Sequence, residues 1–167
     1  YAVRTSLRSM ERKKEILEAL SGSIKDDESL EFCELDLMRD EGWDAAVKGC
    51  SYVLHVASPV YEKNMQDENS FIQPAKEGLL RALKPAVKYK IKRFVMTSSI
   101  AAITQGHEDK EIDESFWSVI DENTLPYIKS KTYAEKAMWD YMNQIDETKK
   151  IEVCTINPSF VFGPSLT

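Results

Sequence analysis

Tyr127 and Lys131 have the side-chain types and the spacing that suit acid–base chemistry. On a helix, residues four apart lie on one face about a turn from each other. An ammonium group close to a phenol favours the phenolate form and so eases release of the phenolic proton. A tyrosine tuned in this way can give its proton to a carbonyl oxygen while hydride reaches the carbonyl carbon. The spacing alone is common on solvated helices, so the rest of the sequence must decide its meaning.

A second group that could do chemistry is the run of hydroxyl side chains Thr97, Ser98 and Ser99, which follows an apolar stretch. A hydroxyl placed at the end of a strand can donate a hydrogen bond to a substrate carbonyl. The alternative is that these residues only cap the strand, for which serine and threonine are suited in any case.

The elements that would position these groups alternate along the chain between short β-branched runs and amphipathic segments. This alternation predicts βαβ units and a parallel sheet. Strands are expected over residues 1–7, 30–34, 51–56, 93–97 and 151–156, and helices over 11–20, 43–48, 67–88 and 126–145. Gly49 should end the second helix and Pro126 should begin the last one. Pro74 and Pro85 should kink or interrupt the third helix. Residues 22–29 and 104–123 are expected to be loops.

Polar or small residues follow each expected strand. Parallel strands joined by right-handed crossovers bring their carboxyl ends to one edge, where open α/β sheets bind ligands. A ligand rim is therefore expected at this edge. It consists of Arg8-Ser9, Asp36-Leu37, Ala57-Ser58-Pro59, Thr97-Ser98-Ser99 and Asn157-Pro158-Ser159.

Four segments, in this order, resemble the extended short-chain dehydrogenases/reductases, specifically the dihydroflavonol 4-reductase-like branch of the NAD(P)-dependent epimerase/dehydratase superfamily. They are YVLHVASP at 52–59, RFVMTSS at 93–99, PYIKSKTYAEK at 126–136 and NPSFVFGP at 157–164. The resemblance implies an α/β fold, a Rossmann-like doubly wound parallel sheet with helices on both faces. Residues 1–167 would be a partial NADP-binding domain that carries the catalytic residues.

Two parts of the family pattern have no counterpart in these residues. The glycine-rich phosphate loop is absent, and with it the first βα unit, roughly 30 residues in the usual layout. The C-terminal substrate-binding portion is absent as well. We expect the 167 residues to be a piece of a longer enzyme rather than a defective relative, and to be inactive by themselves.

The resemblance also implies roles for single residues. Ser99 would polarise the carbonyl, Tyr127 would donate the proton, and Lys131 would tune Tyr127 and bind the nicotinamide ribose. Asp36 and Leu37 match the pair that contacts the adenine, although Asp36 could instead cap a helix. The full set of expected cofactor contacts is Arg8, Lys14, Asp36, Leu37, Val56, Ala57, Ser58, Thr97, Tyr127, Lys131, Pro158 and Ser159.

The form of the cofactor is expected from the end of the first strand. In Rossmann-like folds an acidic residue after the second strand of the fold holds the ribose 2′-hydroxyl of NAD, whereas arginine accommodates the 2′-phosphate of NADP. Here the strand ends in Arg8, with no acid beside it, and Lys14 follows. Guanidinium offers a fork to a phosphate and lysine adds a point charge. NADPH is therefore favoured over NADH. At least one of Arg12, Lys13 and Lys14 should only form a solvated helix face.

The substrate is expected to be a small-molecule carbonyl compound: an aldehyde, a ketone or a dihydroflavonol-like compound. Thr104 stands five residues beyond Ser99, where plant dihydroflavonol reductases carry an asparagine that recognises the flavonoid. This departure favours a broader aldehyde or ketone reductase. Two alternatives stay open: a nucleotide-sugar epimerase or hydroxysteroid-type dehydrogenase, and a non-catalytic NADP-sensing protein of the same fold.

Composition excludes other classes. The net charge of −6 argues against nucleic-acid binding, because phosphate neutralisation needs a basic face. No segment is apolar enough for a membrane span. The three unpaired-looking cysteines suit a reducing, cytoplasmic location and suggest no metal site. A monomer or homodimer is expected. His55 should be a core histidine, and Glu135 and Lys136 should be ordinary helix-surface charges.

Overall fold

The strands of the protein run parallel, in two sheets. The computed structural model describes residues 1–21, 29–59 and 68–163. In the described residues β1 (Val3–Leu7) pairs with β2 (Leu30–Glu34), and a three-stranded sheet has the order β3-β4-β5, with bounds Tyr52–His55, Arg93–Thr97 and Glu152–Ile156. The five strands coincide with the five expected ones, to within two residues at their ends.

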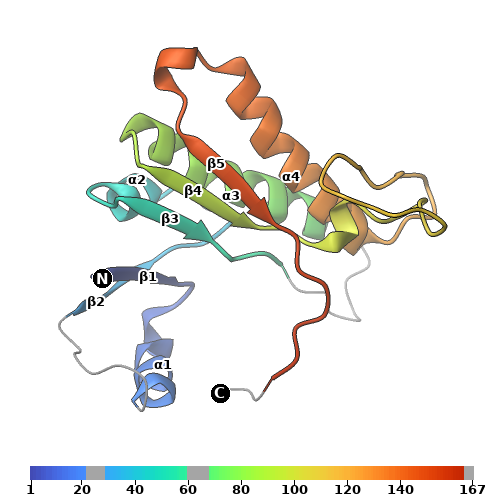
Figure 1. Ribbon diagram of the computed structural model, residues 1–167. Coiled ribbons are helices and arrows are strands. Elements are labelled where there is room, and N and C mark those ends of the chain that lie inside the picture. Colours follow the sequence, from blue (N-terminus) through green and yellow to red (C-terminus); the bar gives the residue numbers. More distant parts are fainter. Residues whose placement is uncertain (22–28, 60–67, 164–167) are drawn as a thin grey trace.

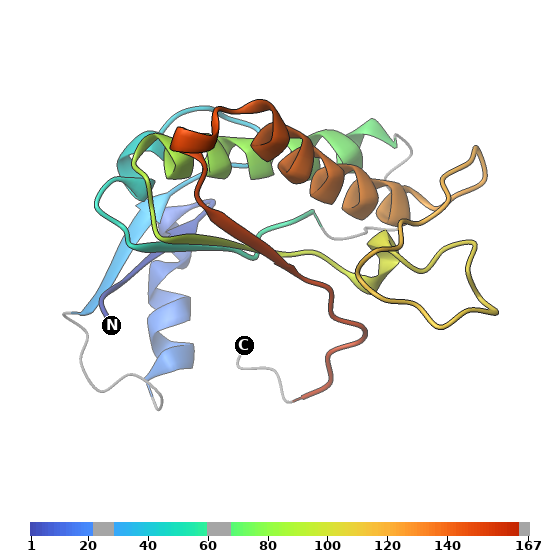
Figure 2. The same cartoon turned by 45° about the horizontal axis from the view of Figure 1, so that its top comes forward.

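The helices lie on both sides of these strands (Figures 1 and 2). The helices α2 (Trp43–Val47), α3 (Asn69–Lys88) and α4 (Pro126–Gln144) cover one face of the three-stranded sheet. On the opposite side, below β1 and β2, lies α1 (Lys13–Leu20), which follows the 3-10 turn η1 (Met10–Arg12). Two further 3-10 turns are η3 (Ile100–Ala102) and η4 (Glu147–Lys149). The predicted α/β class with a Rossmann-like parallel arrangement is confirmed.

The expected interruption of the third helix is wrong. Helix α3 runs unbroken through Pro74 and Pro85. A proline inside a helix costs about 3 kcal/mol through its lost hydrogen bond and ring clash. The packing of α3 against the sheet and against α4 outweighs that cost, since nine of its residues are buried, Pro85 among them. Residue 67, the first of the predicted helix, and residues 22–28 of the predicted loop at 22–29 lie outside the described residues.

Two predicted helix ends are confirmed. Helix α2 stops before Gly49, which has a φ of +83°, a conformation that glycine adopts without steric cost. Helix α4 begins at Pro126, whose missing N–H would have had no partner in the first turn.

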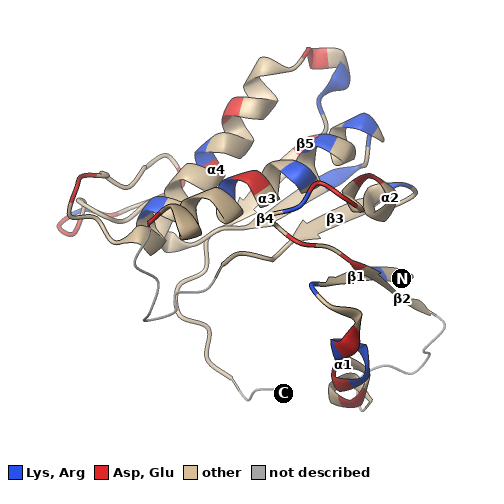
Figure 3. Ribbon diagram, turned by 180° about the vertical axis from the view of Figure 1, so that it is seen from behind, with Lys and Arg blue, Asp and Glu red and all other residues tan. Residues whose placement is uncertain are grey.

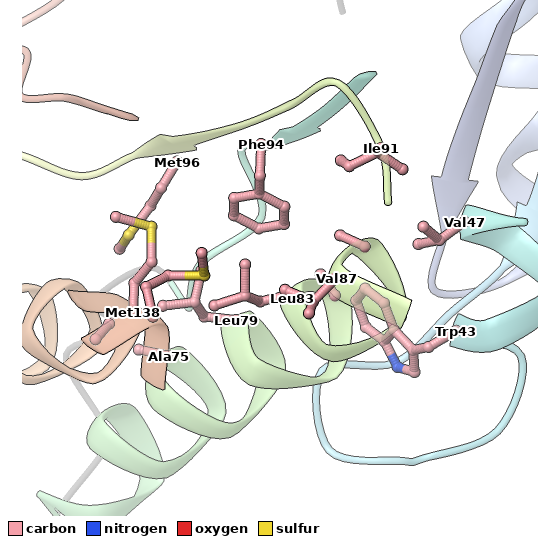
Figure 4. Packing of buried hydrophobic residues seen from close by; sticks show 14 residues of the cluster. Trp43, Val47, Ala75, Leu79, Leu83, Val87, Ile91, Phe94, Met96 and Met138 are labelled. Atoms are coloured by element: carbon pink, nitrogen blue, oxygen red, sulfur yellow. The ribbon is translucent and has the colours of Figure 1, made fainter. Parts of the chain in front are cut away.

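The hydrophobic core lies between the three-stranded sheet and α3 (Figure 4). Alternate residues of β4, Phe94 and Met96, point to the helices, because successive side chains of a strand face opposite sides. Phe94 is fully buried, as are Leu79 and Leu83 of α3 and Met138 of α4. The core therefore locks α3 and α4 onto β4, the strand that leads into the hydroxyl run.

Arg4 joins the two-stranded sheet to the rest of the protein. Its guanidinium donates to the backbone oxygens of Ala45, Ala46 and Lys48 at the carboxyl end of α2, and to the carboxylate of Glu31 on β2. The last carbonyls of a helix have no partner within the helix, so a cation there is stabilising.

Candidate active site

The first part of the site is the inner face of α4. Tyr127 is half-buried, and Lys131 is only 7 % exposed. The Lys131 ammonium lies 5.6 Å from the centroid of the Tyr127 ring. The expected helix and the shared face of the two side chains are thus present, with the ammonium above the aromatic ring.

The Lys131 ammonium has few polar contacts within the described part of the protein. Among the described residues it makes no hydrogen bond and no ion pair, and burial lowers the pKa of its side chain. An ammonium that makes no hydrogen bond to the protein keeps its three N–H groups available to ligand oxygens. The residue therefore fits the ribose hydroxyls of a nicotinamide nucleotide.

The second part of the site is the end of β4, where Ser98 and Ser99 differ sharply. The Ser99 hydroxyl caps η3, accepting from the backbone N–H of Ala101 at 3.1 Å, and so keeps its own proton free to donate. The Ser98 hydroxyl donates to the Glu135 carboxylate at 2.5 Å and is 2 % exposed. Ser99 is also buried, at 7 % exposure, but among the described residues no group of the protein accepts its hydroxyl proton, whereas that of Ser98 is taken by Glu135.

Glu135 departs from the sequence-based expectation of a surface charge, because it is only 5 % exposed. Its carboxylate accepts from Ser98 and from the side-chain amide of Asn157, which lies 2.9 Å away. Glu135 follows Lys131 by four residues and so shares its stripe of α4, but this spacing alone does not indicate that the carboxylate is buried.

The carboxyl end of β1 presents the basic groups (Figure 3). Arg8 is exposed and has no ion pair within the described part of the chain. Arg12 is bound to Glu15 at 2.7 Å, and Lys14 lies 3.7 Å from Glu18, its side chain 87 % exposed. Arg12 is therefore the solvated helix residue that the sequence predicts, whereas the guanidinium of Arg8 fits a phosphate.

The carboxyl end of β2 holds Asp36 and Leu37, both half-buried. Asp36 accepts from the backbone N–H of Met38 at 2.8 Å, so it stabilises a turn, and the alternative of a helix cap is wrong. Leu37 packs on α3 at Gly78, where a Cβ atom would lie 2.5 Å from its Cδ2.

The remaining rim residues follow the ends of β3, β4 and β5 as expected. Their exposure varies: Val56, Ala57 and Ser159 are exposed, whereas Ser58, Thr97 and Pro158 are half-buried.

His55 is a core residue, as predicted. It is 7 % exposed and stacks on Phe94. Burial, with a smaller contribution from the charge of Lys131, lowers its pKa to about 4. At neutral pH its ring is therefore uncharged.

Two negative findings concern the described residues alone. No helix in these ranges combines the length and the apolar character that crossing a membrane requires. No set of three or more His, Cys, Asp or Glu side chains in the same ranges is grouped to hold a metal ion.

A parallel α/β sheet with polar groups collected at its carboxyl edge defines a nucleotide-binding type of fold. The chain belongs to the NAD dependent epimerase/dehydratase family, whose model matches residues 3–167. The predicted resemblance to extended short-chain dehydrogenases/reductases is confirmed.

Two curated relatives that the chain resembles are reductases. The chain is 33 % identical to an anthocyanidin reductase of Vitis vinifera over 177 residues, covering 100 % of this chain and 51 % of that protein. It is 36 % identical to the dihydroflavonol 4-reductase of Arabidopsis thaliana over 140 residues, 79 % of this chain and 36 % of that one. The chain spans about half the length of the first of these relatives.

Two solved reductase structures also resemble the chain. The yeast methylglyoxal/isovaleraldehyde reductase, crystallised with NADPH, matches all of this chain and 53 % of its own length, with a TM-score of 0.85 and 27 % identity. Vestitone reductase from alfalfa matches 94 % of this chain and 48 % of its own, with a TM-score of 0.74 and 31 % identity.

Proposed function

We propose that the protein carrying these residues is an NADPH-dependent carbonyl reductase, of which residues 1–167 form part of the NADP-binding domain. The observation that carries the proposal is the pairing of Tyr127 and Lys131 on α4, the helix whose Glu135 accepts a hydrogen bond from Ser98, next to Ser99 with its free hydroxyl proton. The reductase activities of the relatives support it.

The chemistry follows from the roles of these groups. The reduced nicotinamide supplies the hydride. Ser99 donates a hydrogen bond to the carbonyl oxygen, which draws electron density from the carbonyl carbon. Tyr127 gives its proton to that oxygen, so the carbonyl becomes an alcohol and the tyrosine a phenolate. The ammonium of Lys131 stabilises the phenolate, and its unused hydrogen-bonding capacity holds the ribose.

The preference for NADPH is part of the proposal. Arg8 is exposed, unpaired among the described residues, and directly follows β1. Guanidinium binds phosphate through two parallel hydrogen bonds. The yeast reductase was crystallised with NADPH, which supports the same cofactor here. Lys14, whose side chain is 87 % exposed and borders Glu18, would add a weaker charge.

The substrate class we propose is a small aldehyde or ketone. Thr104, which takes the place of the expected flavonoid-recognising asparagine, lies just after η3, and its backbone N–H donates to Ile100 at 3.0 Å.

The location and assembly that we propose are those expected from the sequence. Three cysteines, all free, suit the cytoplasm, and a monomer or homodimer stays the predicted assembly.

The test is an assay of the protein produced from its complete coding sequence. NADPH absorbance is followed with a panel of aldehydes, diketones and dihydroflavonols, with NADH in parallel. We expect oxidation of NADPH with at least one aldehyde or ketone. Tight NADPH binding without oxidation by any member of the panel would contradict the enzyme and support the cofactor-sensing alternative.

A further inference from the structure

The carboxylate of Glu135 ties together three elements at the site. It lies on α4, and its Oε2 atom accepts from Ser98 at the end of β4 and from Asn157 just after β5. All three side chains are withdrawn from solvent to differing degrees: Ser98 and Glu135 are buried, and Asn157 is half-buried. Among the described residues Glu135 has no cation as partner, so its contacts are these two neutral donors.

The segment that carries Ser99 is held by the same neighbourhood. Asn157 donates through its Nδ2 atom to the backbone oxygen of Ser99 at 3.1 Å while it donates to Glu135. The backbone N–H of Ser98 donates to Ile156 at 2.8 Å, and that of Ile100 donates to Pro158 at 3.1 Å. Ser99 thus sits between two backbone hydrogen bonds, and the Glu135–Asn157 pair fixes its carbonyl.

The helical position of Glu135 makes this contact specific to the site. It lies eight residues beyond Tyr127 and four beyond Lys131, on the stripe of α4 that faces the strand ends. The hydrogen bond that Glu135 accepts from Ser98 therefore links the helix that carries Tyr127 to the segment that carries Ser99, and so sets the distance between them. A displacement of about 1 Å between such groups can cost on the order of a hundredfold in rate.

We propose that Glu135 is a positioning residue for reduction, which holds the Ser99 hydroxyl in register with Tyr127 through Ser98 and Asn157. The inference rests on the proposed carbonyl reductase function. In this role Glu135 only has to supply a hydrogen-bond acceptor at the position of its Oε2 atom. Because both donors use one oxygen atom, a glutamine can offer its carbonyl oxygen to both.

The test compares Glu135→Ala and Glu135→Gln in the protein made from its complete coding sequence. Glu135→Ala should lower kcat by about ten- to a hundredfold, with the KM for NADPH changed by less than about threefold. Glu135→Gln should keep most of kcat. The matched control is Asp140→Ala, an exposed carboxylate on the same helix, which should leave kcat and KM unchanged.

A double-variant comparison separates positioning from general destabilisation. If Glu135 acts through Ser99, then Glu135→Ala should lower kcat no further in a Ser99→Ala background. Multiplicative losses in the double variant, or equal losses for Glu135→Ala and Glu135→Gln, would overturn the inference. If Glu135→Ala does not fold, Ser98→Ala removes one of the two bonds and should show a smaller loss that also disappears in the Ser99→Ala background; a loss that persists there overturns the inference too.

The outcomes also distinguish this inference from the function on which it rests. A wild-type protein that oxidises NADPH while Glu135→Ala is equally active overturns the positioning role alone. A wild-type protein that reduces no carbonyl compound overturns both.

Discussion

Arg8 and Arg12, two arginines close together after β1, have different surroundings. Arg8 stands unpaired at the strand end among the described residues, whereas Arg12, four residues later, is bound to Glu15. An exposed ion pair of this kind contributes little to stability, but it occupies the guanidinium. Only a guanidinium without such a partner can bind a phosphate without first giving up a contact.

Replacing Arg8 with alanine should therefore weaken NADPH binding specifically. We expect the KM for NADPH to rise about tenfold, the equivalent of one charge-assisted hydrogen bond, with the KM for NADH nearly unchanged. Arg12→Ala is the matched control and should change neither value. Steady-state kinetics with both cofactors measure the effect. A parallel rise for NADH would mean that Arg8 acts on the fold or on the pyrophosphate rather than on the 2′-phosphate.

The candidate residues can be predicted from sequence to different extents. Tyr127 and Lys131 are recognisable because their spacing is local to one helix, and Ser99 because it follows a strand. Glu135 is not, because a charged helix residue is exposed by default, and its burial depends on Ser98 and Asn157 from two other strands. A pairing between distant elements has no local signature.

At the scale of elements, periodicity predicts the strands and helices well, and the prolines of α3 are the exception. The irregular stretch at 104–123 is also expected from the sequence. Its anchoring is not: the Ser118 hydroxyl donates to the backbone oxygen of Ala101 and accepts from the N–H of Gln105, which ties the loop to η3. Propensity indicates a loop, but only tertiary contacts fix its path.

Helix α3 approaches the turn after β2 so closely that only glycine fits at position 78. A Cβ atom there would lie 2.5 and 2.8 Å from the Cδ2 and Cβ atoms of Leu37. In an unhindered helix the change to alanine would stabilise by about 1 kcal/mol. We expect Gly78→Ala to lower the free energy of unfolding by about 1 kcal/mol instead, because overpacking costs more than the propensity gains.

Chemical denaturation measures this difference, with the exposed Lys76→Ala on the same helix as the control, expected to change stability by less than about 0.5 kcal/mol. A stabilised Gly78→Ala protein would show that Leu37 moves freely, and would weaken its assignment to a fixed adenine contact.

At the scale of the whole molecule, the parallel arrangement follows from the βαβ alternation, but the joining of the two-stranded sheet to α2 through Arg4 does not. In the sequence Arg4 is one of several basic residues at the start of the chain, and its three carbonyl partners become neighbours only after folding. The core beneath β4 likewise includes His55, whose uncharged ring links the stability of the protein to pH.

His55 should destabilise the fold in acid. Its pKa is lowered from 6.5 to about 4, so between these values the unfolded chain binds the additional proton and stability falls as pH falls. From about pH 7 to about pH 4.5 the loss due to this residue should be on the order of 2–3 kcal/mol. Denaturant melts of the wild type and His55→Gln at both pH values test this. The wild type should lose more stability than the variant, and equal losses would contradict the buried, neutral state of the ring.

The role of Tyr127 as proton donor is the central claim, and one comparison tests it most directly. Cofactor binding and turnover are measured for the wild type and Tyr127→Phe, with NADPH and the best carbonyl substrate. Loss of the proton donor should lower kcat by about a hundred- to ten-thousandfold, while the dissociation constant for NADPH changes by less than about threefold. A Tyr127→Phe protein that turns over at the wild-type rate would contradict the proposed mechanism.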